Sequence, residues 1–240
     1  MIKIVAATDI GLKRKLNEDA FYIDPKRTFV IVADGMGGHA SGEIASTAAV
    51  TAICTHLEKY QPASNEAVGD ILVKAIEFAN EIVFDMNGGK AEERSMGTTI
   101  VMAYFYEDNG TTKAHIAHVG DSRAYVVSDS GGISQLTSDH NVVNSLMEMG
   151  KITEEQAEEH PQRNVLTRAV GTDSIVEVDV AEIEMKRGTY ILLCTDGLTN
   201  AISDFELEQL IKAGKGPKAL CQLANRRSGK DNVTVAIATA

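Results

Sequence analysis

Four aspartates share one kind of setting in this 240-residue chain. Each follows or precedes an apolar run typical of a β-strand, and each lies beside a glycine or one residue from it. In chain order they are Asp34 after FVIVA, Asp121 after HIAHVG, Asp196 after YILLCT, and Asp231 before NVTVAIATA. Clustered carboxylates repel one another unless a cation holds them together, and hard oxygen ligands without paired cysteine or histidine favour Mg²⁺ or Mn²⁺. The pattern therefore favours a metal site.

Strand direction explains how such distant residues can meet. Antiparallel pairing places the end of one strand beside the start of its neighbour, so Asp231, which precedes its strand, can lie next to Asp196, which follows its own. The same holds for Glu18, which begins a strand, and Asp34, which ends the strand that returns after the turn at residues 24–27. Any single aspartate beside a glycine can also be an ordinary turn former. The repeated strand context favours the metal site for the set.

The segment FVIVADGMGGHASGEIAS, residues 29–46, also fits the spacing G-x-G-x-x-A that holds a dinucleotide pyrophosphate. A dinucleotide-binding unit needs a second parallel strand after its helix, but here one helical pattern leads through Gln61-Pro62 into another. Asp34 would also place a negative charge beside the pyrophosphate. We therefore interpret Asp34 as a metal ligand and the adjacent Gly35 as a position where a backbone carbonyl can approach a cation closely.

Two further side chains lie near these carboxylates in the sequence. His39 lies in the glycine-rich loop, where it could donate a proton to a leaving group, and a helix N-cap or loop-packing role fits that position equally well. Arg14 precedes Glu18 in a polar turn, and a guanidinium group recognises phosphate through paired hydrogen bonds. His115 and His118 are three residues apart in a strand pattern, so their side chains should point to opposite faces and share no metal.

Strands are the main elements that must position these residues. Apolar runs bounded by turn residues predict strands near residues 2–8, 19–24, 28–33, 97–106, 113–119, 123–128, 176–185, 189–194 and 232–239. Asp24-Pro25 and Asn109-Gly110 each lie between two of these runs, which favours antiparallel hairpins.

Helical periodicity predicts two long helices over residues 41–60 and 65–86, the second ending at Asn87-Gly88. Because helix follows helix without a strand between them, the pair should cover one face of a sheet. Capping-box spacings, Thr153 with Gln156 and Ser203 with Glu206, predict two shorter helices. The polar segment from about 141 to 165 interrupts the strands and is predicted to be a small helical flap within one α+β domain covering residues 1–240.

Composition excludes several classes of protein. A formal net charge of −11 and a pI near 5.0 argue against general binding to nucleic acid or to anionic membranes. The cysteines at 54, 194 and 221 are widely spaced without a C-x-x-C pair, which favours buried free thiols in a reducing compartment. No leader pattern and no apolar run of about 20 residues is present. We expect a cytoplasmic protein without a membrane span.

Eight short blocks of the sequence, in this order, resemble the metal-dependent serine/threonine protein phosphatases of type 2C, in their bacterial form. The blocks extend from Thr8 to Val235, and the ordered set is far more specific than any one of them. They are TDIGLKRKLNEDAFY, FVIVADGMGGHASGE, MGTTIV, HVGDSRAY, TSDH, LTRAVG, LLCTDGLT and GKDNVTV.

The resemblance implies a central sandwich of two antiparallel β-sheets flanked by helices, with a dinuclear Mn²⁺ or Mg²⁺ site at one edge. It also implies a role for each residue of the site. Asp34 would bridge the two metals, Asp196 and Asp231 would bind the first, the Gly35 carbonyl would bind the second, Glu18 would hold metal-bound water, Asp121 with Asp196 would bind a third and weaker ion, and Arg14 would engage the substrate phosphate.

The implied activity is hydrolysis of phosphoserine and phosphothreonine on proteins by direct attack of water activated between two metals, which would reverse bacterial serine/threonine kinase signalling. Phosphorylated proteins are the implied partners, and a monomer is the implied state. Animal relatives have histidine directly after the metal-binding Asp-Gly, where this chain has Met36, so the catalytic role of His39 stays open.

Two other functions fit parts of the sequence less well. A non-catalytic module that binds phosphoproteins should lack metal aspartates, and none is missing here. A phosphatase of the haloacid dehalogenase type needs a D-x-D pair, but Thr195 and Leu198 flank the single Asp196-Gly197 pair.

Overall fold

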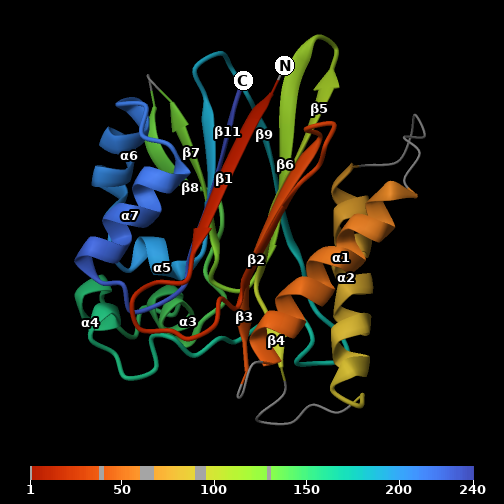
Figure 1. The fold of residues 1–240 in the computed structure, drawn as a ribbon, viewed down its shortest axis with the longest axis vertical. Helices are drawn as coiled ribbons and strands as arrows, with labels where there is room; N and C mark the ends of the chain where they lie inside the picture. Colours follow the sequence, from red (N-terminus) through yellow and green to blue (C-terminus); the bar gives the residue numbers. More distant parts are fainter. Residues whose placement is uncertain (1, 38–40, 60–67, 90–95, 129–130) are drawn as a thin grey trace.

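Two antiparallel β-sheets pack face to face at the centre of the molecule (Figure 1). The structure is a computed structural model and describes residues 2–37, 41–59, 68–89, 96–128 and 131–240. The first sheet has the strand order β1 (Lys3–Asp9), β11 (Val233–Thr239), β10 (Tyr190–Cys194), β7 (Arg123–Ser128), β8 (Gly132–Gln135). The second has the order β2 (Asp19–Ile23), β3 (Phe29–Met36), β5 (Ile100–Asp108), β6 (Thr111–Val119), β9 (Asp179–Glu184), and β4 (Gly97–Thr98) pairs with the end of β3.

Helices cover the outer face of each sheet. The long antiparallel pair α1 (Ser41–Glu58) and α2 (Val68–Met86) packs on the second sheet, while α5 (Asp196–Thr199), α6 (Asp204–Lys212) and α7 (Pro217–Arg227) pack on the first. Two short helices, α3 (Val142–Glu148) and α4 (Glu154–Glu158), lie at one end of the sandwich, and both chain termini lie at the other end (Figure 1).

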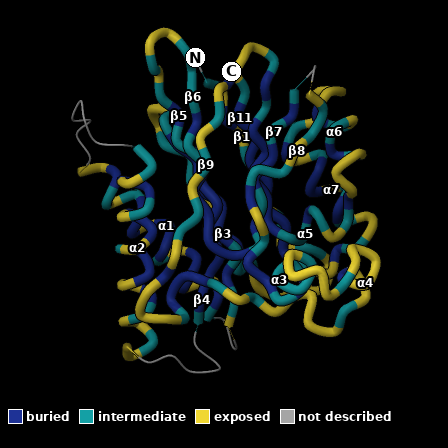
Figure 2. Tube along the Cα trace, turned by 180° about the vertical axis from the view of Figure 1, so that it is seen from behind, coloured by how far each residue is buried: buried dark blue, intermediate teal, exposed yellow. Residues whose placement is uncertain are grey.

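Three apolar layers hold this arrangement together, and single strands contribute to two of them. In β3, Ile31 and Ala33 pack against α1 and α2, whereas Val30 and Val32 pack between the sheets. Both faces of the central strands are therefore buried, which explains why their sequences are continuous apolar runs rather than alternating ones. Figure 2 shows the buried segments concentrated in these strands, and each fully buried aliphatic side chain contributes about 1.5–3 kcal/mol.

All nine predicted strands are present, with differences at their ends. The predicted strand at 97–106 is interrupted at Thr99. Gly97 and Thr98 form β4 and pair with Gly35 and Met36 at the end of β3, and residues from Ile100 onward form β5, which pairs with β3 and β6. The strand β8 was not predicted, because its sequence GISQ is short and contains a single large apolar residue, Ile133. The turn between β5 and β6 is confirmed, with Asn109 and Gly110 both at positive φ (51° and 81°).

The helices confirm most of the predictions and correct one of them. Thr153 and Gln156 form the complete capping box that opens α4. Ser203 is the N-cap residue of α6, but its side chain makes no capping hydrogen bond, and the Glu206 side chain forms an ion pair with Arg227 rather than completing a capping box. The helices α5 and α7 were not predicted. The start of the second long helix, predicted at residue 65, lies outside the described residues.

The three cysteines are free, as predicted. Cys194 and Cys221 are buried, but Cys54 is only half-buried, which corrects the prediction for that residue because its position on α1 is not fully covered. Within the described part of the chain, no helix has both the length and the apolar character needed to cross a bilayer.

Candidate active site

Four separate strands deliver their aspartates to one end of the sandwich. Asp34 lies near the end of β3, Asp121 lies between β6 and β7, Asp196 is the first residue of α5 directly after β10, and Asp231 lies two residues before β11. The sequence-predicted cluster is therefore assembled in the structure. The negative charge of Asp34 is repelled by the charges of four neighbouring carboxylates, those of Asp19, Asp196, Asp121 and Asp231.

Burial is the main cause of the unusual electrostatics of this cluster. Loss of hydration, followed by the repulsion between neighbouring carboxylates, raises the pKa of Asp34 well above its ordinary range. The same cause raises the pKa of Asp121 to about 7 and that of Asp196 to about 6. Without a cation, these carboxyl groups tend to bind protons near neutral pH.

Asp19 belongs to the cluster although the sequence did not single it out. It lies opposite Asp34 in the register of β2 and β3. Its Oδ2 accepts hydrogen bonds from Thr234 Oγ1 at 2.6 Å and Thr195 Oγ1 at 3.1 Å. Its Oδ1 is buried and has no hydrogen-bond partner among the described residues, and burial raises its pKa to about 7. The only sequence signal was its place beside Glu18.

Arg14 lies at the exposed edge of the cluster, as the sequence predicted. Its Nη2 donates a hydrogen bond to Asp231 Oδ2 at 2.8 Å, and its Nη1 lies 3.6 Å from Glu18 Oε2. The hydrogen bond to Asp231 raises the pKa of Arg14 above its ordinary value. About half of the side chain (46%) remains exposed, so the guanidinium can also contact a bound molecule.

Asn232 holds the segment that carries Arg14 and Glu18, and sequence reasoning missed this role. Its Oδ1 accepts from the Glu18 backbone N–H at 2.8 Å, while its Nδ2 donates to the carbonyls of Ile10 and Leu16 at 2.9 and 3.0 Å. A single buried amide therefore ties the β1–β2 loop to the start of β11. The signal available in the sequence was the Asp231-Asn232 pair.

Glycine beside Asp34 is required by close packing of the backbone. A Cβ atom on Gly35 would lie 2.1 Å from the Gly42 carbonyl oxygen and 2.5 Å from that of Glu18. A Cβ atom on Gly42 would lie 2.6 Å from Glu18 Oε1 and 2.7 Å from the Gly35 carbonyl oxygen. The two glycines therefore allow the Gly35 carbonyl and the Glu18 carboxylate to lie next to the first turn of α1.

A histidine supports the loop that carries Asp121. His140 Nδ1 accepts the backbone N–H of Gly120 at 3.0 Å, so its proton lies on Nε2, which faces Asp179 Oδ2 at 3.3 Å. His118 stacks on the His140 ring and, as predicted, shares no face with His115. His118, His140 and Asp179 lie close enough to hold a metal, but the Arg168 guanidinium contacts both His140 and Asp179 and supplies a positive charge there.

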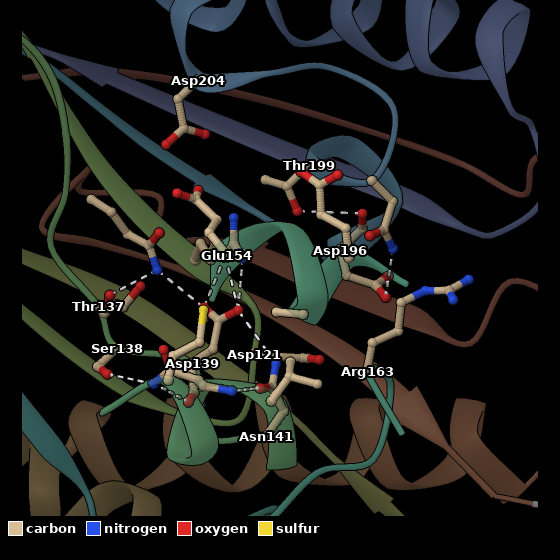
Figure 3. A pocket seen from close by; sticks show the side chains of 18 of the residues that line it. Asp121, Thr137, Ser138, Asp139, Asn141, Glu154, Arg163, Asp196, Thr199 and Asp204 are labelled. Carbon is tan, nitrogen blue, oxygen red and sulfur yellow. Dashed lines mark hydrogen bonds and ion pairs between the residues drawn. The ribbon is translucent and has the colours of Figure 1, made fainter. Parts of the chain in front are cut away.

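Two adjoining cavities open beside Asp196, with volumes of about 740 and 610 Å³. The first lies between α3–α4 and the start of α6 and is lined by Asp121 and Asp196 (Figure 3). The second extends past Asp196 to Asp231 and Lys230. Arg163, which follows α4, lines both cavities. A bound substrate therefore has room on both sides of the carboxylate cluster.

His39 lies outside the described residues, so its predicted role stays a prediction. Met36 is the last residue of β3 and pairs with Gly97. The other predicted site residues are all described, and they gather at this end of the sandwich: Arg14, Glu18, Asp34, Gly35, Asp121, Asp196 and Asp231.

The donor atoms of the cluster fit a divalent cation. They are carboxylate and carbonyl oxygens without a thiol or imidazole, which suits Mn²⁺ or Mg²⁺. A bound cation would account for two features of the cluster. The Oδ1 of Asp19 is buried without a hydrogen-bond partner among the described residues, and the pKa values of Asp34, Asp121 and Asp196 are raised.

Comparison with known proteins identifies the family. Residues 13–226 match the family model of protein phosphatase 2C. The chain belongs to the protein phosphatase 2C family. It is 39% identical to a 2C-type protein phosphatase of Streptococcus pyogenes, over 98% of this chain and 96% of that protein. The protein phosphatase PhpP of Streptococcus pneumoniae is 35% identical over the same shares of both chains.

Solved structures of this family have the same fold. The serine/threonine phosphatase of Streptococcus agalactiae superposes with a TM-score of 0.89 at 34% identity and full coverage of both chains. The catalytic domain of the phosphatase PstP, solved with two manganese ions, gives a TM-score of 0.85 at 30% identity, over 99% of this chain and 97% of that one. This family member is therefore a protein-serine/threonine phosphatase that depends on a divalent metal, and its two-sheet fold is confirmed.

Proposed function

We propose that the carboxylate cluster is the site at which this phosphatase hydrolyses phosphoserine and phosphothreonine on proteins. The observation that carries the proposal is the convergence of Asp34, Asp196 and Asp231, from three strands, beside Asp19, whose buried Oδ1 has no hydrogen-bond partner among the described residues. Arg14 lies at the open edge of this cluster, where a phosphoryl group on a protein surface would enter.

The ligand assignment is part of the proposal. Asp34 would serve both core ions, Asp196 and Asp231 would hold the first, and the Gly35 carbonyl would hold the second, while Glu18 would orient coordinated water. Asp121 and Asp196 hold a third and weaker ion. When bound, Mn²⁺ or Mg²⁺ lowers the pKa of a coordinated water and neutralises charge on the phosphoryl oxygens.

The remaining work is done by side chains of this chain. Arg14 binds the phosphate and neutralises charge that develops on its oxygens. Asp19 accepts a hydrogen bond from water in the cluster through Oδ1, because Thr195 and Thr234 already donate to its other oxygen. A proton reaches the departing serine or threonine oxygen from His39 or from water in the cluster. The α3–α4 segment, at residues 141–165, acts as a flap beside the site within one catalytic domain spanning residues 1–240.

The physiological setting is proposed from the same features. The partners are phosphorylated proteins, and the enzyme opposes a bacterial serine/threonine kinase. We expect it to act as a monomer in the cytoplasm, where its three free cysteines stay reduced.

Hydrolysis of a phosphothreonine peptide with and without Mn²⁺ tests the proposal directly. The wild type should release phosphate only with the metal, and both chelator and Asp34→Asn should abolish turnover. Unchanged turnover in the chelator or in the variant would contradict the metal mechanism. Binding of the peptide without any turnover by the Mn²⁺-loaded wild type would favour a phosphoprotein-binding module.

The role of His39 has its own test. His39→Ala should slow hydrolysis of the phosphothreonine peptide much more than that of p-nitrophenyl phosphate, because p-nitrophenolate leaves without needing a proton. An equal effect on both substrates would assign His39 to loop packing.

A further inference from the structure

The cavity between the flap helices and α6 has an unbalanced charge. Its carboxylates are Asp121, Asp139, Asp196, Glu154, Glu158 and Asp204, and among the described residues its guanidinium groups are those of Arg123 and Arg163. Asp139 and Arg123 neutralise each other through several hydrogen bonds, and Asp121 and Asp196 belong to the proposed metal site. The remaining wall is acidic.

Three of its carboxylates are available to a ligand. Glu154 and Glu158 on α4 and Asp204 on α6 are exposed, and within the described part of the chain none of them forms a side-chain hydrogen bond or an ion pair. Apart from Arg123, Arg163 is the positively charged residue that lines this cavity in the part of the chain that the structure describes. Figure 3 shows Glu154 and Asp204 on the same cavity as Asp121 and Asp196. A cationic group would therefore be attracted beside the reaction site.

An exposed aromatic ring lines the same cavity. Phe205 follows Asp204 in the first turn of α6, and 73% of its surface is exposed, which is high for a large apolar side chain. A lysine or arginine side chain matches this pairing of ring and carboxylate. Its aliphatic stem can pack on the ring while its charge meets the carboxylates and the ring face.

Other occupants fit less well. An acidic side chain would be repelled by Glu154, Glu158 and Asp204, and an apolar one would cover those carboxylates without giving them a partner. The cavity is also continuous with the proposed catalytic centre through Asp121 and Asp196. Since the same cavity is lined by Asp196, a side chain close in sequence to the phosphorylated residue can reach it.

We propose that this cavity binds a lysine or arginine side chain of the substrate and gives the phosphatase a preference for phosphorylated sites flanked by basic residues. The inference rests on the proposed function, because it places the phosphorylated residue at the carboxylate cluster. It assigns Asp204, Phe205, Glu154 and Glu158 as specificity-determining residues.

Three matched phosphothreonine peptides test the preference. They differ only in the positions flanking the phosphothreonine, which carry lysine, alanine or glutamate. With Mn²⁺ at low ionic strength, kcat/KM for the lysine peptide should exceed that for the alanine peptide by about 2- to 5-fold, since an exposed ion pair contributes up to about a factor of five. The glutamate peptide should be poorest, and added salt should reduce the differences.

Charge reversal at one position then locates the effect. Asp204→Lys should bring kcat/KM for the lysine peptide close to that for the alanine peptide. It should also raise kcat/KM for the glutamate peptide relative to the alanine peptide. Phe205→Ala should reduce the preference for the lysine peptide in part. Asp70→Lys is the matched control, because Asp70 is also an exposed acidic residue in the first turn of a helix, and α2 lies on the opposite side of the molecule from α6 (Figure 1). It should leave all three ratios unchanged.

The possible outcomes separate this inference from the proposed function. Equal rates for the three peptides, or ratios that Asp204→Lys does not move, would overturn the basic-side-chain site while leaving the phosphatase assignment intact. Failure to hydrolyse any peptide and p-nitrophenyl phosphate would contradict the proposed function. In that case fluorescence anisotropy with the same three peptides decides the inference, which predicts tightest binding of the lysine peptide.

Discussion

Asp19 and Asp34 lie directly opposite each other on β2 and β3, and the free Oδ1 of Asp19 is buried within the carboxylate cluster. Two threonines occupy its other oxygen, so the orientation of the carboxyl group is fixed. We infer that Asp19 is a positioning residue for the metal site. It acts through the groups around it, as the residues surrounding metal ligands commonly do.

The first prediction follows from this pairing. Asp19→Asn keeps the shape but removes a buried charge, so it should lower Mn²⁺ affinity or kcat by about 10- to 100-fold. The same variant should be more stable than the wild type when the metal is removed, because an uncompensated buried carboxylate is costly. Isothermal titration with Mn²⁺ and melting curves in chelator measure the two effects. A variant that loses both activity and metal-free stability would show that Asp19 is only a structural residue.

The second prediction concerns pH. Asp19 has an ordinary pKa of about 3.9 in the unfolded chain and about 7 in the fold, so the native state binds the extra proton between these values. This contribution to stability is complete below about pH 4 and is lost as the pH rises through 7. In chelator, the melting temperature of Asp19→Asn should therefore exceed that of the wild type by more at pH 8 than at pH 5.5.

Comparing the wild type with Asp19→Asn at each pH removes the effect of the histidines on stability, which has the opposite pH dependence. Burial lowers the pKa of His115, His118 and His140, and these groups destabilise the fold as the pH falls below about 6.5 in both proteins alike. For a chain of this size, each kcal/mol should move the melting temperature by about 2–4 °C. A difference between the proteins that is constant from pH 5.5 to 8 would contradict the raised pKa of Asp19.

The sequence predicts those parts of the site that show a local pattern, and it misses those that depend on contacts between residues far apart in the chain. Asp34 and Asp196 were found because each ends an apolar strand, which is a local pattern. The environment of Asp19 is not local, since its partners Thr195 and Thr234 lie 176 and 215 residues away. Asn232 likewise holds residues more than 200 positions distant. Such contacts depend on how the two sheets pack.

The same distinction applies to the elements. The central strands and the two long helices have strong periodic patterns and were predicted, whereas β8 and α7 were not. Gly216-Pro217 would ordinarily indicate a turn, but here Gly216 is the N-cap residue and Pro217 begins α7, where its missing N–H costs nothing. Local signals are ambiguous in such places, and packing against β1 and β11 decides the outcome.

The third prediction concerns Arg14. Arg14→Ala should lower kcat/KM for a phosphothreonine peptide by about 100-fold, because a charged donor to the phosphate is lost at the point where negative charge develops. Arg14→Lys should recover only part of the activity, since an ammonium group cannot form paired hydrogen bonds. Inorganic phosphate should also inhibit both variants more weakly. The neighbouring exposed Lys13→Ala is the control and should behave like the wild type. Equal loss in both alanine variants would point to general surface charge instead.

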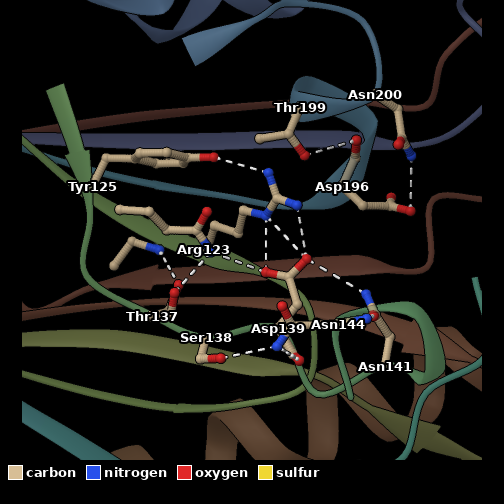
Figure 4. A network of polar contacts seen from close by, with 12 residues as sticks. Arg123, Tyr125, Thr137, Ser138, Asp139, Asn141, Asn144, Asp196, Thr199 and Asn200 are labelled. Carbon is tan, nitrogen blue, oxygen red and sulfur yellow. Dashed lines mark hydrogen bonds and ion pairs between the residues drawn. The ribbon is translucent and has the colours of Figure 1, made fainter. Parts of the chain in front are cut away.

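The last prediction concerns the ion pair that connects the Asp121 strand to the flap (Figure 4). Arg123 begins β7 two residues after Asp121 and donates to both carboxylate oxygens of Asp139, from Nε at 2.9 Å and from Nη2 at 2.8 Å. Only 10% of the Asp139 side chain is exposed, and Asn141, two residues later, is the N-cap residue of α3. Asp139→Ala should therefore leave a largely covered guanidinium, 29% exposed, without its counter-charge.

This change should cost about 3–5 kcal/mol and lower the melting temperature by on the order of 10 °C. Glu177→Ala is the control, because it breaks an ion pair with Arg168 whose carboxylate is 80% exposed, and it should cost less than about 1 kcal/mol. Activity should fall more in Asp139→Ala than its stability alone explains, since the loop of Asp121 and the first turn of α3 lose a common anchor. Equal melting temperatures for the two variants would show that Arg123 finds another partner, and the pair would then have no role in joining the flap to the site.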